Sequence, residues 1–183
     1  MLDLRIQQHF IDSADLHYQL AEGLAKPVGA AVQALLASVT GGGKVLTLGH
    51  GHDALQAQYL AALLLGGFER ARPGLPALAL GGALAPLQTL QALGQAGDVL
   101  FVLASTAPDE ALLAAVTHAH ERDMAVLALT GAASTEWVHA LRETDVHIAV
   151  AHERVARVRE VHHLVLHCLC DAIDTQLLGE QEA

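Results

Sequence analysis

Basic residues are scarce in this chain. Its 183 residues include ten Lys and Arg against twenty Asp and Glu, which gives a formal net charge of -10 at pH 7. Affinity for a nucleic acid depends heavily on cations that displace counterions from the phosphates, so direct binding to nucleic acid is not expected. An acidic surface suits solubility or a basic protein partner.

Cysteine and long apolar runs are scarce as well. The only cysteines are Cys168 and Cys170, which face different directions on a helix, so we expect buried thiols rather than a disulfide or a metal pair. No apolar run approaches the roughly 20 residues of a membrane span. The start MLDLRIQQHF lacks the basic-then-apolar order of a signal peptide. We therefore expect a cytoplasmic protein that does not bind a membrane.

Short apolar runs alternate with longer segments of helical spacing, and 52% of the residues are hydrophobic, which is enough for a sizeable core. Strands are expected over 44–48, 76–80, 98–104, 124–129 and 145–150, and helices over 53–65, 84–93, 108–122 and 134–141. Two helices, 4–24 and 27–39, are expected before the sheet, with Pro27 in the first turn of the second, and helix 155–178 closes the chain. This pattern predicts one α/β domain in which helices cover both faces of a parallel sheet.

Three turns follow expected strands at the edge of the sheet where ligands bind. They read GHGHD (49–53), STAPDE (105–110) and LTGAAST (129–135). Turns of this type hold phosphate with backbone N–H groups, small hydroxyl side chains and a helix N-terminus. The acid at position 53 is therefore unexpected.

Five segments resemble, in order and spacing, those of the sugar isomerase (SIS) domain proteins: GGGKVLTLGHG, ERARPGLPALAL, QAGDVL, MAVLALTG and ARVREVHHLVLHCLCDAID. The resemblance runs over nearly the whole chain and is greatest to the branch of phosphoheptose isomerase and its non-enzymatic relative DiaA, which binds the replication initiator DnaA. The ending HCLCDAID with TQLL resembles the DiaA side. The resemblance implies a three-layer fold with a five-stranded parallel sheet, and a homotetramer with sites between subunits. Within a single domain, residues 1–42 would be helices used in oligomerisation, 43–150 the core and 151–183 the C-terminal helix.

The resemblance places a sugar-phosphate cleft at ten positions: Gly49, His50, Gly51, His52, Asp53, Ser105, Thr106, Asp109, Thr130 and Gly131. The family has serines where this chain has Asp53 and Asp109. A carboxylate about 4 Å from a phosphate adds repulsion of order 4 kcal/mol at an effective dielectric near 20, so a phosphosugar is not expected in the usual pose. We expect both acids to cap free N–H groups at helix starts and so to replace the phosphate. An acid-base role is the alternative.

The resemblance also implies zinc ligands, a His and a Glu followed by a Gln and a His. The matching residues here are Tyr59, Leu63, Arg159 and His167, of which only His167 is an acceptable ligand. Leu63 cannot serve as a general acid or base. We therefore expect no catalytic residue of the parent type, no cofactor and no metal. A new site formed by His163 with His167, or by His50 with His52, is the alternative to structural or surface histidines.

Two functions remain open. In the first, an adaptor related to DiaA presents several copies of a weak site to DnaA from a homotetramer. The resemblance then places Leu177 and Leu178 at the partner surface, with ordinary packing as the alternative. In the second, the chain is a sugar-phosphate isomerase of the phosphoheptose isomerase type, or a sensor of a carbohydrate derivative with an altered ligand, such as an amine or an unphosphorylated sugar. A partner unrelated to replication is a third possibility.

Overall fold

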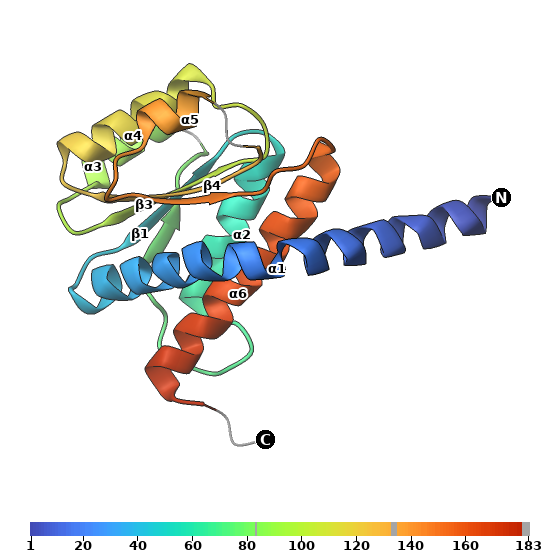
Figure 1. The fold of residues 1–183 in the computed structure, drawn as a ribbon. Helices are drawn as coiled ribbons and strands as arrows, with labels where there is room; N and C mark the ends of the chain where they lie inside the picture. The colour runs from blue at the N-terminus through green and yellow to red at the C-terminus, as the bar shows by residue number, and fades with distance from the viewer. Residues whose placement is uncertain (83, 133–134, 181–183) are drawn as a thin grey trace.

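A parallel five-stranded sheet forms the middle layer of the structure, a computed structural model that describes residues 1–82, 84–132 and 135–180 (Figure 1). The strands are β1 (Val45–Gly49), β2 (Ala77–Ala79), β3 (Val99–Ala104), β4 (Ala125–Thr130) and β5 (Val146–Ala149). Their order across the sheet is β2-β1-β3-β4-β5, and every neighbouring pair is parallel. All five predicted strands are present, and the predicted fold class is confirmed.

The central strands are largely apolar because helices cover both of their faces. Every residue of β1 and β3 is buried. The register pairs Gly49 with Leu103 and Ala104 with Thr130, so β1, β3 and β4 end at about the same level. The three turns that follow these strands therefore meet at one edge of the sheet, as expected for a parallel arrangement.

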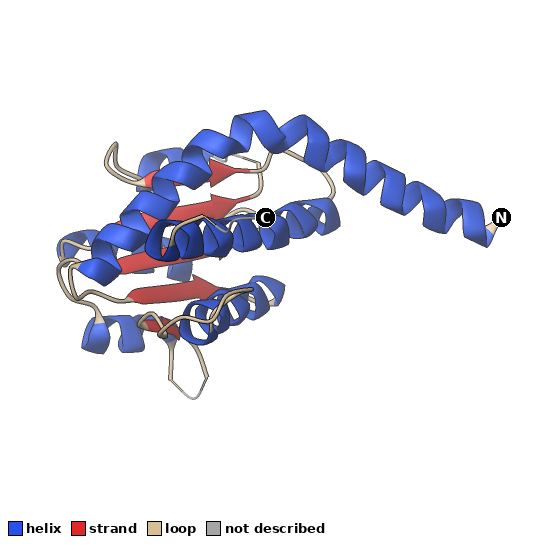
Figure 2. Cartoon of the chain, turned by 90° about the horizontal axis from the view of Figure 1, so that it is seen from below, coloured by secondary structure: helices blue, strands red, loops and turns tan. Residues whose placement is uncertain are grey.

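Helices form the two outer layers (Figures 1 and 2). One layer holds α1 (Leu2–Thr40), α2 (His52–Gly66) and α6 (Val155–Leu178), and the other holds α3 (Pro86–Leu93), α4 (Glu110–Glu121) and α5 (Thr135–Ala140). Alternate residues of β3 point to the two cores: Phe101 packs with the first layer and Val102 with the second. The helix predicted over 134–141 starts at Ser134, which lies outside the described residues.

The N-terminal segment is one helix rather than the two that were predicted. Pro27 lies inside α1 instead of at a helix start. A proline in a helix interior loses one hydrogen bond and costs about 3 kcal/mol, and it commonly bends the helix, as α1 does along its length in Figure 2. Leu24 and Val28, on either side of Pro27, both pack against the first core. Packing on both sides of the proline therefore keeps the helix continuous.

The first half of α1 projects beyond the three layers (Figure 1). Its exposed large apolar side chains include Leu4, Phe10 and Ile11. Within the described part of the chain, α1 is the only helix long and apolar enough, by length and composition alone, to cross a membrane. Its second half buries Val32 and Leu35 in the first core, so this half of the helix packs against the sheet.

Candidate functional site

The predicted cleft residues gather where β1 and β3 lie side by side. In this strand order the chain leaves the two strands in opposite directions, and parallel sheets bind ligands beyond the carboxyl ends of their strands at such a point. The turns there are tight: a Cβ on Gly49 would lie 2.5 Å from the carbonyl oxygen of Asp53, and one on Gly131 would lie 2.7 Å from that of Ser105. Gly51 has a φ of 56°, which favours glycine. Glycine at position 49 lets the first turn fold back closely on itself, and glycine at position 131 lets the third turn approach the second.

Asp53 joins the first turn to the second. Its Oδ2 accepts hydrogen bonds from the backbone N–H of Ser105 at 2.8 Å and from the Ser105 hydroxyl at 2.9 Å. The prediction that Asp53 caps α2 is wrong, because the N-cap residue is Gly51 and no side chain caps this helix. The buried donors of Ser105 satisfy the carboxylate in place of the N–H groups of α2, although Asp53 still lies in the first turn, where the helix dipole favours an acid.

Arg159 completes this network from α6. Its Nε donates to the hydroxyl oxygen of Ser105 at 3.0 Å and lies 3.4 Å from Oδ1 of Asp53. The Asp53 carboxylate is therefore paired with a cation, which offsets the repulsion predicted for an isolated acid. From the sequence, Arg159 was interpreted only as a residue that replaces a metal ligand of the family. An acid and an arginine at two positions of one cleft were the signal that could have predicted the pair.

Asp109 does cap a helix, as predicted. Its Oδ1 accepts a hydrogen bond from the backbone N–H of Leu112 at 2.8 Å at the start of α4, and its Oδ2 lies 2.5 Å from Nδ1 of His50. Burial alone would raise the pKa of Asp109, but the hydrogen bonds from Leu112 and His50 outweigh it and hold the pKa below its usual value. Both acids, at positions where the family pattern has serine, therefore bind groups of the chain itself.

The third turn contacts one buried histidine, His162, and one partly buried histidine, His147. Thr130 is fully buried, its Oγ1 lies 2.9 Å from Nε2 of His147, and its carbonyl oxygen accepts a hydrogen bond from Nε2 of His162 at 3.0 Å. Burial lowers the pKa of both His162 and His147, so both are neutral near pH 7. Thr130 and Gly131 thus form the buried base of the site, whereas His52 and Thr106 are exposed at its rim.

The positions that match the family's zinc ligands hold contacts of another kind. The hydroxyl of Tyr59 lies 2.8 Å from Nε2 of His167, and the Tyr59 ring stacks on His163 with centroids 4.7 Å apart. Leu63 packs against the first core. Over residues 1–82, 84–132 and 135–180, no group of three or more His, Cys, Asp and Glu residues is placed to hold a metal ion. His167 and Tyr59 form a hydrogen-bonded pair instead.

Comparison with known proteins agrees with this architecture. A model of the SIS domain matches residues 8–93. A phosphoheptose isomerase from Methylibium petroleiphilum is 50% identical over 196 aligned residues, which span 100% of this chain and 98% of the relative. The chain belongs to the SIS domain family.

Solved structures place this SIS domain in the branch of the phosphoheptose isomerases. The phosphoheptose isomerase of Neisseria gonorrhoeae matches with a TM-score of 0.87 and 33% identity over 96% of this chain and 100% of its own. That of Francisella tularensis matches with a TM-score of 0.88 and 32% identity over 96% and 99%. The resemblance inferred from the sequence is confirmed at the level of family and branch.

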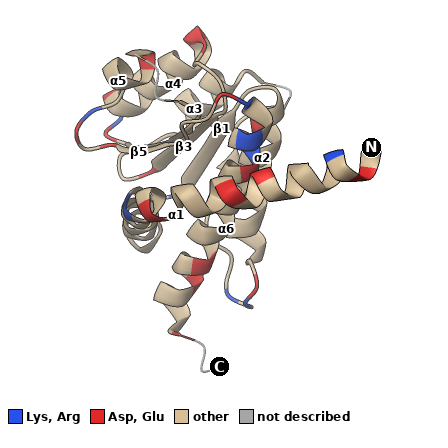
Figure 3. Ribbon diagram, turned by 45° about the vertical axis from the view of Figure 1, so that its right-hand side comes forward, with Lys and Arg blue, Asp and Glu red and all other residues tan. Residues whose placement is uncertain are grey.

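Leu177 and Leu178 lie far from the cleft of this SIS domain. They end α6, and their exposed fractions are 39% and 41%. At a rise of about 1.5 Å per residue, Leu178 is roughly 28 Å along the helix axis from Arg159. Lys and Arg occur in a few separate places in the view of Figure 3, without a continuous basic face. Any partner surface at the end of α6 is thus separate from the cleft.

Proposed function

We propose that this SIS domain binds a carbohydrate derivative, of the sugar-phosphate class or close to it, in the cleft beyond β1, β3 and β4. The observation that carries the proposal is the network of Asp53, Ser105 and Arg159 at the crevice where parallel sheets bind ligands. Asp53 and Ser105 are buried and bonded to each other, and together they hold the partly exposed guanidinium of Arg159, whose remaining N–H groups can donate to the oxygens of a sugar derivative. The identity to proteins named phosphoheptose isomerase supports the same ligand class.

The proposal does not extend to zinc-dependent isomerisation. Tyr59, Leu63 and Arg159 supply no ligand of the kind that zinc prefers, and Arg159 would direct a positive charge towards the ion. Asp53 is engaged by three donor groups, so it is not a free base for proton abstraction. What these residues can do is bind and orient a ligand. Turnover of sedoheptulose 7-phosphate by metal-free protein would add an isomerase activity to the proposal.

A thermal-shift series tests ligand binding. A ligand that binds only the folded state raises the melting temperature, so we expect at least one of sedoheptulose 7-phosphate, sedoheptulose and related sugars to do so. Ser105→Ala should reduce the shift, because it removes the hydroxyl that accepts the hydrogen bond from Nε of Arg159. Ser38→Ala is the matched control, because Ser38 is another buried serine, and its hydroxyl bonds the carbonyl of Gly97 outside the cleft. The proposal fails if no sugar shifts the melting temperature, or if both variants respond as the native chain does.

A second candidate function is that of a DiaA-like adaptor that binds DnaA and regulates the initiation of replication. It is favoured by the adjacent exposed side chains of Leu177 and Leu178 at the free end of α6. A pull-down of the cognate DnaA should succeed with the native chain and weaken with Leu178→Ala. Leu93→Ala is the control, since Leu93 has a similar exposed fraction of 39% on α3 in the opposite layer. Failure of the native chain to retain DnaA would count against the adaptor.

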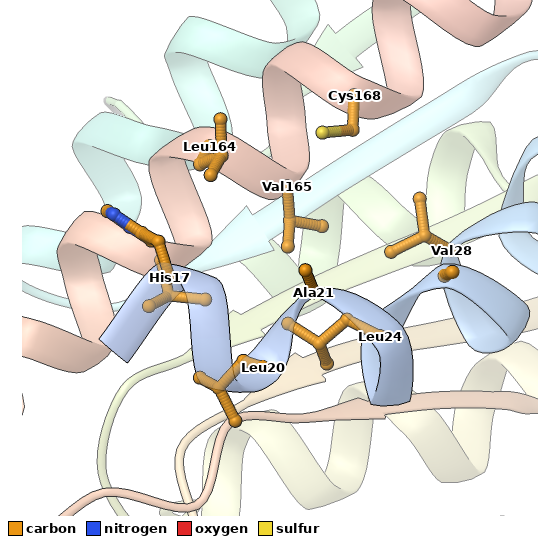
Figure 4. A pocket seen from close by; sticks show the side chains of 10 residues that line it. His17, Leu20, Ala21, Leu24, Val28, Leu164, Val165 and Cys168 are labelled. Carbon is orange, nitrogen blue, oxygen red and sulfur yellow. The ribbon is translucent and has the colours of Figure 1, made fainter. Parts of the chain in front are cut away.

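We also propose that the chain self-associates as a homotetramer through α1 and α6. A pocket of about 240 Å³ between these helices is lined by apolar side chains, among them Leu20, Leu24 and Leu164 (Figure 4). An exposed apolar surface such as the lining of this pocket often marks an interaction site in a soluble protein. Native mass spectrometry should show a tetramer for the native chain and smaller species for Leu24→Glu. A monomeric native chain would refute this part of the proposal.

A further inference from the structure

We infer that the guanidinium of Arg159 is a seat for an anionic group of the ligand, placed outside the buried acid of Asp53. The inference rests on the proposed function and adds the chemical class of the ligand. That class is a carbohydrate carrying an oxyanion, either a phosphate or a carboxylate.

The inner position of the crevice is filled by the chain itself. Ser105 directs both its N–H and its hydroxyl to Asp53 Oδ2, at 2.8 and 2.9 Å. The Asp53 side chain is 7% exposed. A phosphate in this inner position would have to displace a carboxylate that belongs to the protein and is held by buried donors. The anion of any ligand must therefore bind elsewhere.

Arg159 is the part of this network that solvent reaches. Its side chain is 32% exposed, more than four times as much as that of Asp53. The guanidinium carries five N–H donors in a planar fork, and the one on Nε is directed at Ser105 and Asp53. No residue in the described part of the chain accepts a hydrogen bond from Nη1 or Nη2. Four N–H donors thus remain for a ligand.

The guanidinium is held in place before a ligand arrives. Its Nε is bound on the inner side, and the backbone carbonyl of Arg159 accepts a hydrogen bond from Nε2 of Gln56 at 2.8 Å. A planar fork fixed in this way loses little conformational entropy on binding and matches two oxygens of a carboxylate or phosphate. An anion on Nη1 and Nη2 lies nearer to the guanidinium than to Asp53. Attraction therefore exceeds the repulsion from the acid behind it.

Isothermal titration calorimetry at low ionic strength tests this seat. The probes are inorganic phosphate, sedoheptulose 7-phosphate, glucuronate and the neutral sugar sedoheptulose. We expect a phosphate or carboxylate probe to bind the native chain at least about tenfold more tightly than sedoheptulose, and Arg159→Gln to lose at least about tenfold for that probe, since hydrogen bonds to charged groups are strong. Because Arg159→Gln leaves Asp53 unpaired, the double variant Asp53→Asn with Arg159→Gln is measured beside it.

Arg154→Gln is the matched control. Arg154 is the N-cap residue of the same helix, and its side chain is 51% exposed. Its replacement should change the affinity for the anions by no more than about twofold, because a loosely paired surface charge contributes little. A loss in both Arg159 variants but not in Arg154→Gln supports the seat. The probe that binds more tightly then distinguishes phosphate from carboxylate.

The remaining outcomes separate this inference from the proposed function. Equal anion affinity in the native chain and the double variant overturns the seat, and the proposed function survives if sedoheptulose still binds. Binding of inorganic phosphate alone, dependent on Arg159, supports the seat but refutes the carbohydrate ligand. If no probe binds, both fail.

Discussion

Arg72 and Asp174 form an ion pair that is almost wholly enclosed by the protein. Nε of Arg72 lies 2.5 Å from Oδ1 of Asp174, and their side chains are only 1% and 2% exposed. Nη1 of Arg72 also donates to the carbonyl oxygen of Leu64, near the end of α2. The pair therefore fastens the last helix to the segment that connects α2 with β2, on the side of the sheet away from α3, α4 and α5.

We predict that breaking this pair is costly. Asp174→Asn should lower the free energy of unfolding by about 3–5 kcal/mol, because it leaves the Arg72 charge buried without its partner. Asp12→Asn is the control: the pair of Asp12 with Arg154 is 41% and 51% exposed, so its loss should cost less than about 1 kcal/mol. Urea unfolding measures both, and equal losses would contradict the prediction.

Acidification should destabilise the fold through His162. Burial lowers the pKa of this imidazole from its ordinary value of 6.5. Between the folded and the unfolded pKa the unfolded chain binds the additional proton, so the free energy of unfolding falls as the pH drops below about 6.5. Urea unfolding at pH 7.5 and pH 5.5 should show this decline. His162→Gln should reduce it, whereas replacing the exposed His139 by Gln should not. The same decline in both variants would exclude His162 as its source.

The cap of α4 gives a third prediction. Asp109→Ala should destabilise the protein by about 0.5–2 kcal/mol, the usual cost of an N-cap. Asp109→Ser restores the residue of the family pattern and can still accept the hydrogen bond from Leu112, so most of the stability should return. Chemical denaturation of the three chains at neutral pH makes the comparison. A serine variant as unstable as the alanine variant would show that the contact with His50 matters more than the cap.

Zinc binding should be gained when the residues at the positions of the family's zinc ligands are replaced by acceptable ligands. The unaltered chain, purified without added metal, should contain no stoichiometric zinc by elemental mass spectrometry. The variant Tyr59→His, Leu63→Glu, Arg159→Gln, combined with Asp53→Ser to avoid an unpaired acid, presents four acceptable ligands with His167. It should bind zinc, and it should lose the metal again when His167→Ala is added. Stoichiometric zinc in the unaltered chain would contradict our assignment of Tyr59 and His167 as a hydrogen-bonded pair.

The two cysteines should differ in reactivity. Burial raises the pKa of Cys170 to about 12, whereas Cys168 is exposed, although burial and the nearby Asp171 also raise its pKa. Because the thiolate is the reactive form, alkylation at pH 8 should modify Cys168 slowly and leave Cys170 unmodified until the protein unfolds. Intact mass spectrometry of Cys168→Ser and Cys170→Ser follows each thiol separately. Rapid labelling of folded Cys168→Ser would refute the prediction.

The sheet could be predicted from the sequence because buried parallel strands are continuous apolar runs with clear boundaries. Each observed strand end lies within one residue of its predicted place, as β3 at Val99–Ala104 does for the predicted 98–104. The break predicted at Pro27 was wrong because local preference competes with packing. Leu24 and Val28 gain contacts with the core only if the helix continues, and one sequence does not show those contacts.

The location of the cleft was predictable from three turns, but its hydrogen bonds were not. The Asp109 cap spans three residues and follows from local spacing. Asp53 instead bonds Ser105, 52 positions away, and pairs with Arg159, 106 positions away. Local rules predict that Asp53 bonds the nearest N–H groups of its own helix, whereas in the fold its donors come from Ser105 and Arg159. Distances of this kind depend on the register of β1 and β3, which periodicity does not supply.

The close approaches at Gly49 and Gly131 restrict the backbone of these turns more than the side chains that the turns carry. A Cβ on Gly49 would collide with the backbone of Asp53 in the same turn, and one on Gly131 with the backbone of Ser105 in the neighbouring turn, so the backbone here tolerates little change. The side chains that these turns carry are not subject to that limit, so an acid can stand where the family pattern has serine without a change in the strands. A backbone arrangement of this kind can therefore persist when the ligand that it binds changes.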